Sequence, residues 1–297
     1  MKLRSPIALI IFNRPELTQI IFDKIAQVKP SKLFVVADGP RPDRAGEENR
    51  CFQAREIINQ VNWDCEVFKN YSDENLGCKS RVSSGLDWVF EAVPEVIILE
   101  DDCNPSLDFF WFCDELLEKY RDDERISIIS GCNFQMKNNL EDSSYYFSRL
   151  THIWGWASWR RTWRYYDVSA SSWPEFRNYL LTTKISMSEK KFWLEKFQST
   201  YDGLIDTWDY QLVLAMWAQH KLSIIPNVNL ISNIGFGADA THTSSVNIFS
   251  NMSSGQLSFP LKHPQFMLDN LSADDFTANA MFSSGILNKI FRKIKKL

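Results

Sequence analysis

The sequence predicts an α/β fold in which helices flank a mostly parallel central sheet. Two observations predict it. In the first half of the 297-residue chain, segments with strand patterns alternate with segments that have helical patterns. The strand segments are continuous apolar runs, which is typical of strands that are buried on both faces. A chain of this length holds one large α/β domain or two small ones.

The elements of the first half follow from the spacing of apolar side chains. Residues 7–12 form a β-rich apolar run, and residues 16–27 repeat apolar side chains at helical spacing. The second expected strand covers residues 33–37, and the turn signal Asp38-Gly39-Pro40 ends it. The other expected strands are 65–68, 96–99 and 126–130, and the other expected helices are 49–60, 79–92 and 108–120.

The second half has weaker signals. Residues 145–164 are aromatic and cationic, residues 192–219 have helical patterns, and residues 221–225 read as a short strand that ends at Pro226. Residues 232–258 are rich in Ser, Asn, Gly and Thr, which predicts a loop.

We expect one large domain over residues 1–245, made of the halves 1–135 and 136–245, followed by an extension over 246–297. In this extension, residues 286–297 place apolar side chains on one face of a helix and basic side chains on the other. Such a helix is typical of a membrane-surface element, although a helix docked on its own domain has the same pattern.

Composition restricts the classes of function. Hydrophobic residues make up 44% and charged residues 24%, which is typical of a folded globular protein. The formal net charge of -4 does not favour a nucleic-acid partner. The six cysteines lack C-x-x-C spacing, so we expect free thiols in a reducing compartment rather than a structural zinc site. No segment approaches the ~18 apolar residues of a membrane span, which predicts a cytoplasmic protein, at most peripheral at the inner face of the membrane.

Three consecutive carboxylates, Glu100, Asp101 and Asp102, follow the predicted strand 96–99 directly. Adjacent carboxylates repel one another, and a divalent cation among them relieves the repulsion. Oxygen ligands suit Mn²⁺ or Mg²⁺, which also bind phosphate oxygens. Alternation along a strand points Glu100 and Asp102 to one side and Asp101 to the other. An acidic triplet alone is usually a solvated turn, but its place after a buried strand favours a metal site.

Residues that follow the other strands are further candidates, because ligands of such sheets bind beyond the carboxyl ends of the strands. Asn13 and Arg14 follow the first strand, and an arginine there can pair with a diphosphate or stack on a base, although a surface residue that opens a helix is the alternative. Asp38 can accept hydrogen bonds from a base or ribose, although a simple Asp-Gly turn is the alternative. Arg81 lies at the start of a predicted helix, which either suits an anion or is an ordinary solvated helix start.

Two carboxylates, Asp206 and Asp209, lie on either side of Trp208. An apolar neighbour favours proton uptake by a carboxylate, so either one could act as a general base. Asp206 fits equally well as the N-cap of the helix that follows. His242 is a lone histidine in a polar loop, and it either binds a metal or has no special role.

Aromatic residues are abundant, with 11 Trp and 21 Phe, and many lie between residues 154 and 217. They form either an aromatic core or a pocket that stacks on sugar rings. The candidates for such a pocket are Trp154, Gly155, Trp156 and Trp208.

Taken in order, these segments resemble the GT-A fold glycosyltransferases, in particular the N-acetylglucosaminyltransferase I type and bacterial sugar transferases of similar pattern. The resemblance covers residues 5–245 in unbroken order, and its strongest piece is Val-Ile-Ile-Leu-Glu-Asp-Asp at 96–102. The other pieces are Ile-Ile-Phe-Asn-Arg-Pro at 10–15, Val-Ala-Asp-Gly-Pro at 36–40, Asn-Leu-Gly-Cys-Lys-Ser-Arg at 75–81, Trp-Gly-Trp at 154–156, the segment 206–210 and the segment 226–242.

The resemblance implies a GT-A, Rossmann-like, nucleotide-sugar-binding fold and a role for each matching acid. In that family the last acid of Glu-Asp-Asp binds Mn²⁺, which implies that Asp102 is the metal ligand. The middle acid contacts the ribose or the sugar, which implies that role for Asp101. The acid after the second strand contacts the uracil, which implies Asp38.

The remaining roles concern the diphosphate and the base. The arginine after the first strand lies against the nucleotide in that family, which implies Arg14. The acid of the Trp-Asp piece is the general base, which implies Asp209. The family has two adjacent acids where this chain has Trp208-Asp209, so Asp206 stays a competing base.

The predicted activity is metal-dependent, inverting transfer of a hexose or N-acetylhexosamine from a nucleotide-sugar, UDP-linked by resemblance, to an acceptor hydroxyl. The expected acceptor is a glycan or a lipid-linked molecule in polysaccharide or glycoconjugate synthesis, with membrane contact through residues 286–297. Two alternatives stay open. A sugar nucleotidyltransferase usually has a Gly-rich basic loop after the first strand, which Asn13-Arg14-Pro15 lacks. An inactive glycan-binding protein could keep the same fold.

Overall fold

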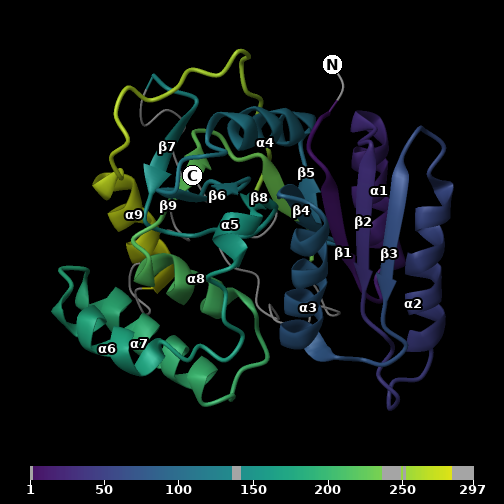
Figure 1. The fold of residues 1–297 in the computed structure, drawn as a ribbon, viewed down its shortest axis with the longest axis horizontal. Coiled ribbons are helices and arrows are strands. Elements are labelled where there is room, and N and C mark those ends of the chain that lie inside the picture. The colour runs from purple at the N-terminus through teal and green to yellow at the C-terminus, as the bar shows by residue number, and fades with distance from the viewer. Residues whose placement is uncertain (1–2, 136–141, 236–248, 250–251, 283–297) are drawn as a thin grey trace, which may run out of the picture.

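A computed structural model describes residues 3–135, 142–235, 249 and 252–282. Its centre is a sheet with the strand order β3-β2-β1-β4-β8-β6-β9-β7 (Figure 1). These strands are β1 Ile7–Ile11, β2 Lys32–Ala37, β3 Glu66–Tyr71, β4 Glu95–Glu100, β6 Ile126–Ser130, β7 Tyr145–Ser148, β8 Trp156–Trp159 and β9 Leu222–Pro226. A separate antiparallel pair joins β5 (Cys103–Pro105) to β10 (Ile231–Asn233).

Most strands of the central sheet run in the same direction. β3, β2, β1 and β4 pair in parallel, and β6 pairs in parallel with β9. β8 lies antiparallel between β4 and β6, and β7 is antiparallel to β9 at the edge. The predicted mostly parallel α/β sheet flanked by helices is therefore confirmed, with two antiparallel strands that the sequence patterns did not reveal.

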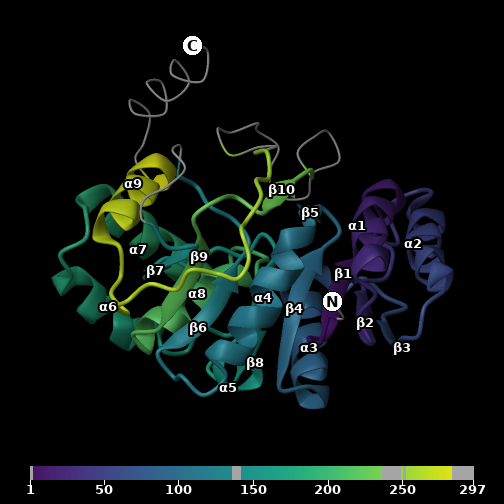
Figure 2. The same ribbon diagram turned by 90° about the horizontal axis from the view of Figure 1, so that it is seen from above.

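Alternating side chains of the central strands face two separate cores. Ile7, Leu9 and Ile11 of β1 pack into one core with α1 (Pro15–Val28), α2 (Glu47–Glu56) and α4 (Leu107–Lys119). Ala8 and Ile10 face the other core, which contains α3 (Gly77–Ala92), α5 (Arg160–Trp163) and α8 (Asp209–Ala218). Figure 2 shows the same arrangement from above. Burial on both faces explains why these strands are continuous apolar runs.

A further helical layer covers α8. α6 (Trp173–Thr182) and α7 (Met187–Tyr201) bury Trp173 and Phe197 against α8, at the end of the molecule away from β3 (Figure 1). A 3₁₀ turn, η1 (Ile57–Gln60), extends α2.

α9 (Leu271–Phe282) lies in the predicted extension 246–297 and contacts α7. Its Asp274 accepts hydrogen bonds from Ser148 Oγ at 2.5 Å and from the Arg149 N–H at 3.1 Å. These hydrogen bonds connect the described part of the extension to the end of β7 in the central sheet. The predicted boundaries at residues 135 and 245 stay predictions, and the amphipathic segment 286–297 lies outside the described residues. Within the described ranges, no helix is long and apolar enough to cross a membrane.

Candidate active site

The strand order reverses between β1 and β4. The chain proceeds outward from β1 to β2 and β3, and then returns to place β4 on the other side of β1. In open α/β sheets, ligands bind beyond the carboxyl ends of the strands at such a switch point. The register pairs Ile10 with Glu100 and Ile11 with Ala37, so β1, β2 and β4 end at nearly the same level. Asp38 follows β2, Arg14 lies just beyond β1, and the acidic triplet begins at the last residue of β4.

Arg14 bridges two carboxylates of the triplet. Its Nη1 lies 3.0 Å from Asp102 Oδ2, and its Nη2 donates a hydrogen bond to Asp101 Oδ1. Burial lowers the pKa of Arg14, but the two carboxylates outweigh burial and the net shift is upward, so the guanidinium stays charged. Asp101 is buried, and its Oδ2 has no hydrogen-bond partner among the described residues.

The triplet carries more negative charge than Arg14 balances. Burial, followed by the charges of Asp102 and Asp101, raises the pKa of the Glu100 carboxyl. Burial also raises the pKa of Asp101, although Arg14 opposes that shift. Both shifts mean that full ionisation of the triplet is unfavourable without further positive charge. The charge of this site therefore fits an additional cation.

The geometry around Asp102 restricts how a cation could be held. In the described ranges, no group of three or more His, Cys, Asp or Glu side chains is arranged to hold a metal ion. A metal bound here would rely on Asp102, whose side chain is 18% exposed, together with oxygen atoms of a bound substrate or water. His242, the other predicted metal ligand, lies outside the described residues.

The segment after β10 packs directly on Asp102. The Ile234 N–H donates to the Asp102 backbone carbonyl at 2.8 Å, and the Gly235 N–H donates to Asn233 Oδ1 at 2.9 Å. A Cβ atom at Gly235 would overlap Asp102 Oδ2. Residue 235 therefore has to be small for the carboxylate to keep this position.

Substituting Gly235→Ala is expected to displace the Asp102 carboxylate. Rotation of the Asp102 side chain relieves the overlap with Oδ2, while the contact with Asp102 Cβ at 2.8 Å needs a small backbone shift, so we expect the protein to fold with a moderate loss of thermal stability. The apparent affinity for Mn²⁺ in the presence of a nucleoside diphosphate should fall by about tenfold. Titration calorimetry checks this, with Gly255→Ala as the control, because that glycine has no left-handed φ and its added Cβ would lie 3.2 Å from the nearest atom, Val228 Cβ, without touching Asp102. Unchanged metal affinity in Gly235→Ala would contradict the expectation.

Asp38 organises the loop that precedes α3. Its carboxylate accepts hydrogen bonds from the N–H groups of Gly39, Leu76 and Gly77 at 2.9, 2.9 and 3.2 Å, and from Asn75 Nδ2 at 3.0 Å. Burial raises its pKa, and these backbone donors oppose the shift. Asp38 thus fixes the β3–α3 loop beside the site, and its predicted contact with a base stays a prediction.

Arg81 and Asn13 also hold protein segments in place. Arg81 is buried and its Nη2 donates to Asn70 O at 2.7 Å and to Asn70 Oδ1 at 2.9 Å. Asn13 donates to Glu47 Oε1 at 2.7 Å, at the start of α2. Both residues lie near the carboxyl edge of the sheet, where donor binding was predicted for them.

The two candidate bases, Asp206 and Asp209, differ in their hydrogen-bond partners. Both carboxylate oxygens of Asp206 accept backbone hydrogen bonds at the start of α3, from the Cys78 N–H at 3.1 Å and the Lys79 N–H at 3.0 Å. Asp206 therefore caps α3 across 127 residues of sequence separation. Asp209 is the first residue of α8, and its Oδ1 accepts from Thr207 Oγ1 and from the Tyr210 N–H at 2.9 Å.

Four acidic side chains of the candidate site act electrostatically on the thiol of Cys78. Burial raises the pKa of its thiol well above the usual range, and the next causes are the charges of Glu100, Asp206, Asp209 and Asp38. Four carboxylates from β4, α8, the segment before α8 and the end of β2 therefore lie within electrostatic range of one side chain. The sequence offers no signal that singles out Cys78 as this meeting point, because the contacts come from distant segments.

The predicted aromatic pocket is placed largely in the core. Trp156 and Trp208 are 1% and 2% exposed and stack on each other, with ring centroids 5.8 Å apart. Trp154 is partly buried beside Phe134. Gly155 has φ +61° and would place a Cβ against Ile231, so glycine is required there by the backbone. Among these four residues, Trp154 is the one that is only partly buried.

Comparisons with known proteins find similarity to solved structures at low identity. No protein-family model matches the sequence, and no curated protein matches it at a significant level. Similar crystal structures include UDP-glucose pyrophosphorylase complexed with UDP-glucose (10% identity, 75% of this chain and 90% of that chain, TM-score 0.38). Others are 4-diphosphocytidyl-2C-methyl-D-erythritol synthase from Anaerococcus prevotii (11%, 72% and 99%, TM-score 0.35) and mouse xyloside xylosyltransferase 1 (11%, 74% and 85%, TM-score 0.34). At these TM-scores and identities, a shared function does not follow.

Proposed function

We propose that this chain is a metal-dependent glycosyltransferase of the GT-A type, which transfers a sugar from a nucleotide-sugar to an acceptor hydroxyl with inversion. One observation carries the proposal. At the switch point of the sheet, a charged arginine from the end of β1 bridges two carboxylates from the end of β4, in a cluster that has an excess of negative charge. Such a cluster suits a cation together with a diphosphate, because the cation balances both sets of oxygen atoms.

The donor would lie along the carboxyl edge of β2, β1 and β4. Asp38 and Arg81 would border the base, while Asn13 and Arg14 would face the nucleotide. When a diphosphate and Mn²⁺ or Mg²⁺ bind, Arg14 can exchange its bond with Asp102 for phosphate oxygens, since its bond to Asp101 holds the guanidinium in place. Glu100 and Asp101 would face the ribose or the sugar.

A bound metal ion would be held by Asp102 and would supply charge stabilisation to the departing diphosphate. The protein's own contribution is positional. Ile234 and Gly235 follow β10 directly. They fix the Asp102 backbone and limit the space around the Asp102 carboxylate. The predicted second ligand, His242, and most of the predicted loop 232–258 lie outside the described residues.

Asp209 is the better candidate for the general base. Both oxygens of Asp206 are occupied by the backbone at the start of α3, and taking a proton there would break the cap. Asp209 lies at the helix end that faces Glu100, whose pKa its charge helps to raise. In this role Asp209 would take the proton from the acceptor hydroxyl as it attacks the anomeric carbon.

A panel of nucleotide-sugars tests the activity without knowledge of the acceptor. Each donor is incubated with the protein and Mn²⁺, and the products are identified. A glycosyltransferase releases a nucleoside diphosphate and free sugar by slow hydrolysis of its own donor. A sugar nucleotidyltransferase instead exchanges labelled pyrophosphate into a nucleoside triphosphate. A glycan-binding protein without activity does neither. Absence of any donor hydrolysis across the panel would count against the proposal.

A further inference from the structure

The segment that leads into α8 contacts the candidate base through the hydroxyl of Thr207. Thr207 Oγ1 donates a hydrogen bond to Asp209 Oδ1, and the Tyr210 N–H donates to the same oxygen atom at 2.9 Å. The Thr207 hydroxyl does not cap α8, because the N-cap position belongs to Trp208 and no side chain caps the helix there. This hydroxyl therefore acts on the carboxylate and not on the helix backbone.

The backbone of Thr207 is itself held by neighbouring segments. Gln211, which is 1% exposed, donates from Nε2 to the Thr207 carbonyl at 2.7 Å and to the Val168 carbonyl at 3.4 Å. The preceding residue, Asp206, accepts the two backbone hydrogen bonds at the start of α3. The hydroxyl thus projects from a segment that is fixed to α3 on one side and to residue 168 on the other.

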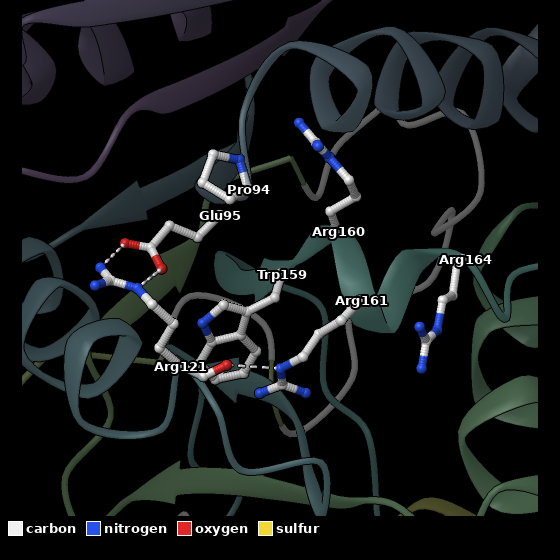
Figure 3. Close-up of a pocket in the computed structure, with 7 residues that line it drawn as sticks. All are labelled: Pro94, Glu95, Arg121, Trp159, Arg160, Arg161 and Arg164. Atoms are coloured by element: carbon white, nitrogen blue, oxygen red, sulfur yellow. Dashed lines mark hydrogen bonds and ion pairs between the residues drawn. The ribbon is translucent and has the colours of Figure 1, made fainter.

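Trp208 anchors the same segment to the central sheet. Its ring is 2% exposed and stacks on Trp156, which begins β8. The other end of β8 is fixed by Arg161 of α5, whose guanidinium lies 4.2 Å from the centre of the Trp159 ring. Figure 3 shows this arginine beside Trp159, with its hydrogen bond to the Arg121 carbonyl at 2.9 Å. A site that is built on such fixed elements holds its side chains in narrow orientations.

The surroundings of Asp209 disfavour its negative charge. Titratable side chains within electrostatic range include Glu100 of β4, Cys78 of α3, Tyr166 after α5 and Tyr210 of α8. Burial, followed by the charge of Asp209, raises the pKa of the Tyr166 and Tyr210 hydroxyls. A like charge and a desolvated environment both favour the protonated form of a carboxyl group. A hydrogen bond donated to the carboxylate has the opposite effect.

We propose that Thr207 is a positioning residue for the general base, which orients the Asp209 carboxylate and favours its ionised form. This inference rests on the proposed function, in which Asp209 takes the proton of the acceptor hydroxyl. As the acceptor oxygen bonds to the anomeric carbon, its proton passes to the carboxylate. The nucleoside diphosphate leaves with the electron pair of the broken C–O bond. Thr207 keeps its own proton throughout, since it only donates a hydrogen bond.

Three variants separate the hydroxyl from the rest of the side chain. Thr207→Val removes the hydroxyl and keeps a β-branched side chain of nearly the same shape, and the bond from Gln211 to its carbonyl persists. Thr207→Ser keeps the hydroxyl and tests for rescue. The matched control is Thr200→Val, because Thr200 is 5% exposed and its Oγ1 has no hydrogen-bond partner among the described residues.

The titration of Asp209 is measured by NMR on protein that carries carbon-13 at its aspartate side-chain carboxyl carbons, so that Glu100 gives no signal. The signal that is missing from Asp209→Asn identifies the residue. Because the lost hydrogen bond favours the ionised form, Thr207→Val should raise the pKa of Asp209 by about one pH unit. Thr207→Ser and Thr200→Val should leave the pKa of Asp209 within a few tenths of a pH unit.

Sugar transfer at saturating donor and Mn²⁺ gives the second readout. A protonated Asp209 cannot take the acceptor's proton, so kcat falls at low pH, and in Thr207→Val this fall should begin about one pH unit higher. Above this fall, kcat should be lower by about tenfold, because the carboxylate is no longer held in one orientation. The KM for the donor should stay unchanged, and Thr207→Ser should restore kcat.

Two kinds of failure are distinguishable. An unchanged pKa of Asp209 in Thr207→Val, an equal rise in Thr200→Val, or a loss of kcat that is the same at every pH and is not restored in Thr207→Ser would overturn the role of Thr207. If the unmodified protein transfers no sugar, the proposed function fails and the catalytic role of Thr207 fails with it, even when the NMR titration shows the expected rise.

Discussion

Substituting Asp102→Ala is expected to lower metal-dependent donor turnover by about three orders of magnitude. The substitution removes the carboxylate that would hold the metal ion. Arg14 keeps its hydrogen bond to Asp101, so no buried charge is left without a partner. We therefore expect the free energy of unfolding to fall by no more than about 2 kcal/mol. Donor hydrolysis with Mn²⁺ and a denaturation curve measure the two effects.

The matched control is Asp43→Ala. Its side chain is 76% exposed and pairs with the neighbouring Arg44 at 3.9 Å. This variant should have the turnover and the stability of the unmodified protein. Full metal-dependent turnover in Asp102→Ala would rule out the metal role that we assign to this residue.

Substituting Asp209→Asn is expected to lower kcat by a factor of about 10² to 10⁴, which is the range of a lost general base. The amide has nearly the same shape as the carboxylate, so α8 should still begin at residue 209. Affinity for the nucleoside diphosphate should change little, because the base acts on the acceptor hydroxyl. Steady-state transfer to an acceptor, with separate calorimetry for the nucleotide, distinguishes the two effects.

Asp206→Asn is the control for this prediction. Asparagine has one acceptor oxygen where Asp206 uses two, so α3 should keep one of its two capping hydrogen bonds, and the protein should stay folded with a loss of about 1 kcal/mol in the free energy of unfolding. If Asp206 only caps α3, kcat should stay within a few-fold of the unmodified protein. A large loss of kcat in Asp206→Asn with normal turnover in Asp209→Asn would reverse the assignment.

The parallel part of the sheet could be predicted because each of its strands is buried on both faces. Such a strand is a continuous apolar run that ends where polar residues begin, as in residues 95–102. β8 was missed because Trp156–Trp159 reads Trp-Ala-Ser-Trp, which has neither a long apolar run nor a clear alternation. Its four residues are buried because β4 and β6 lie on either side of it, and this information lies in distant segments.

The candidate site was predictable at the level of strand ends. The acidic triplet, Arg14 and Asp38 follow strands, and parallel strands bring their carboxyl ends together. The bridge from Arg14 to Asp101 and Asp102 was not predictable from local patterns, because it depends on β1 lying next to β4. The same holds for Asp206, whose capping partners at 78 and 79 belong to another helix.

The aromatic residues gave the least reliable guide to the site. Trp156 and Trp208 were candidates for stacking on a sugar, but each ring covers the other within the core. An aromatic residue has the same local pattern whether its ring faces a ligand or another ring, so tertiary contacts decide its role.

Titration of UDP into the protein, with and without Mn²⁺, tests the central claim most directly, because it measures whether the cluster of Arg14, Asp101 and Asp102 takes up a cation and a diphosphate together. We predict binding with Mn²⁺, much weaker binding without it, and loss of the metal-dependent part in Asp102→Ala. Equal affinity for UDP with and without the metal would contradict the account.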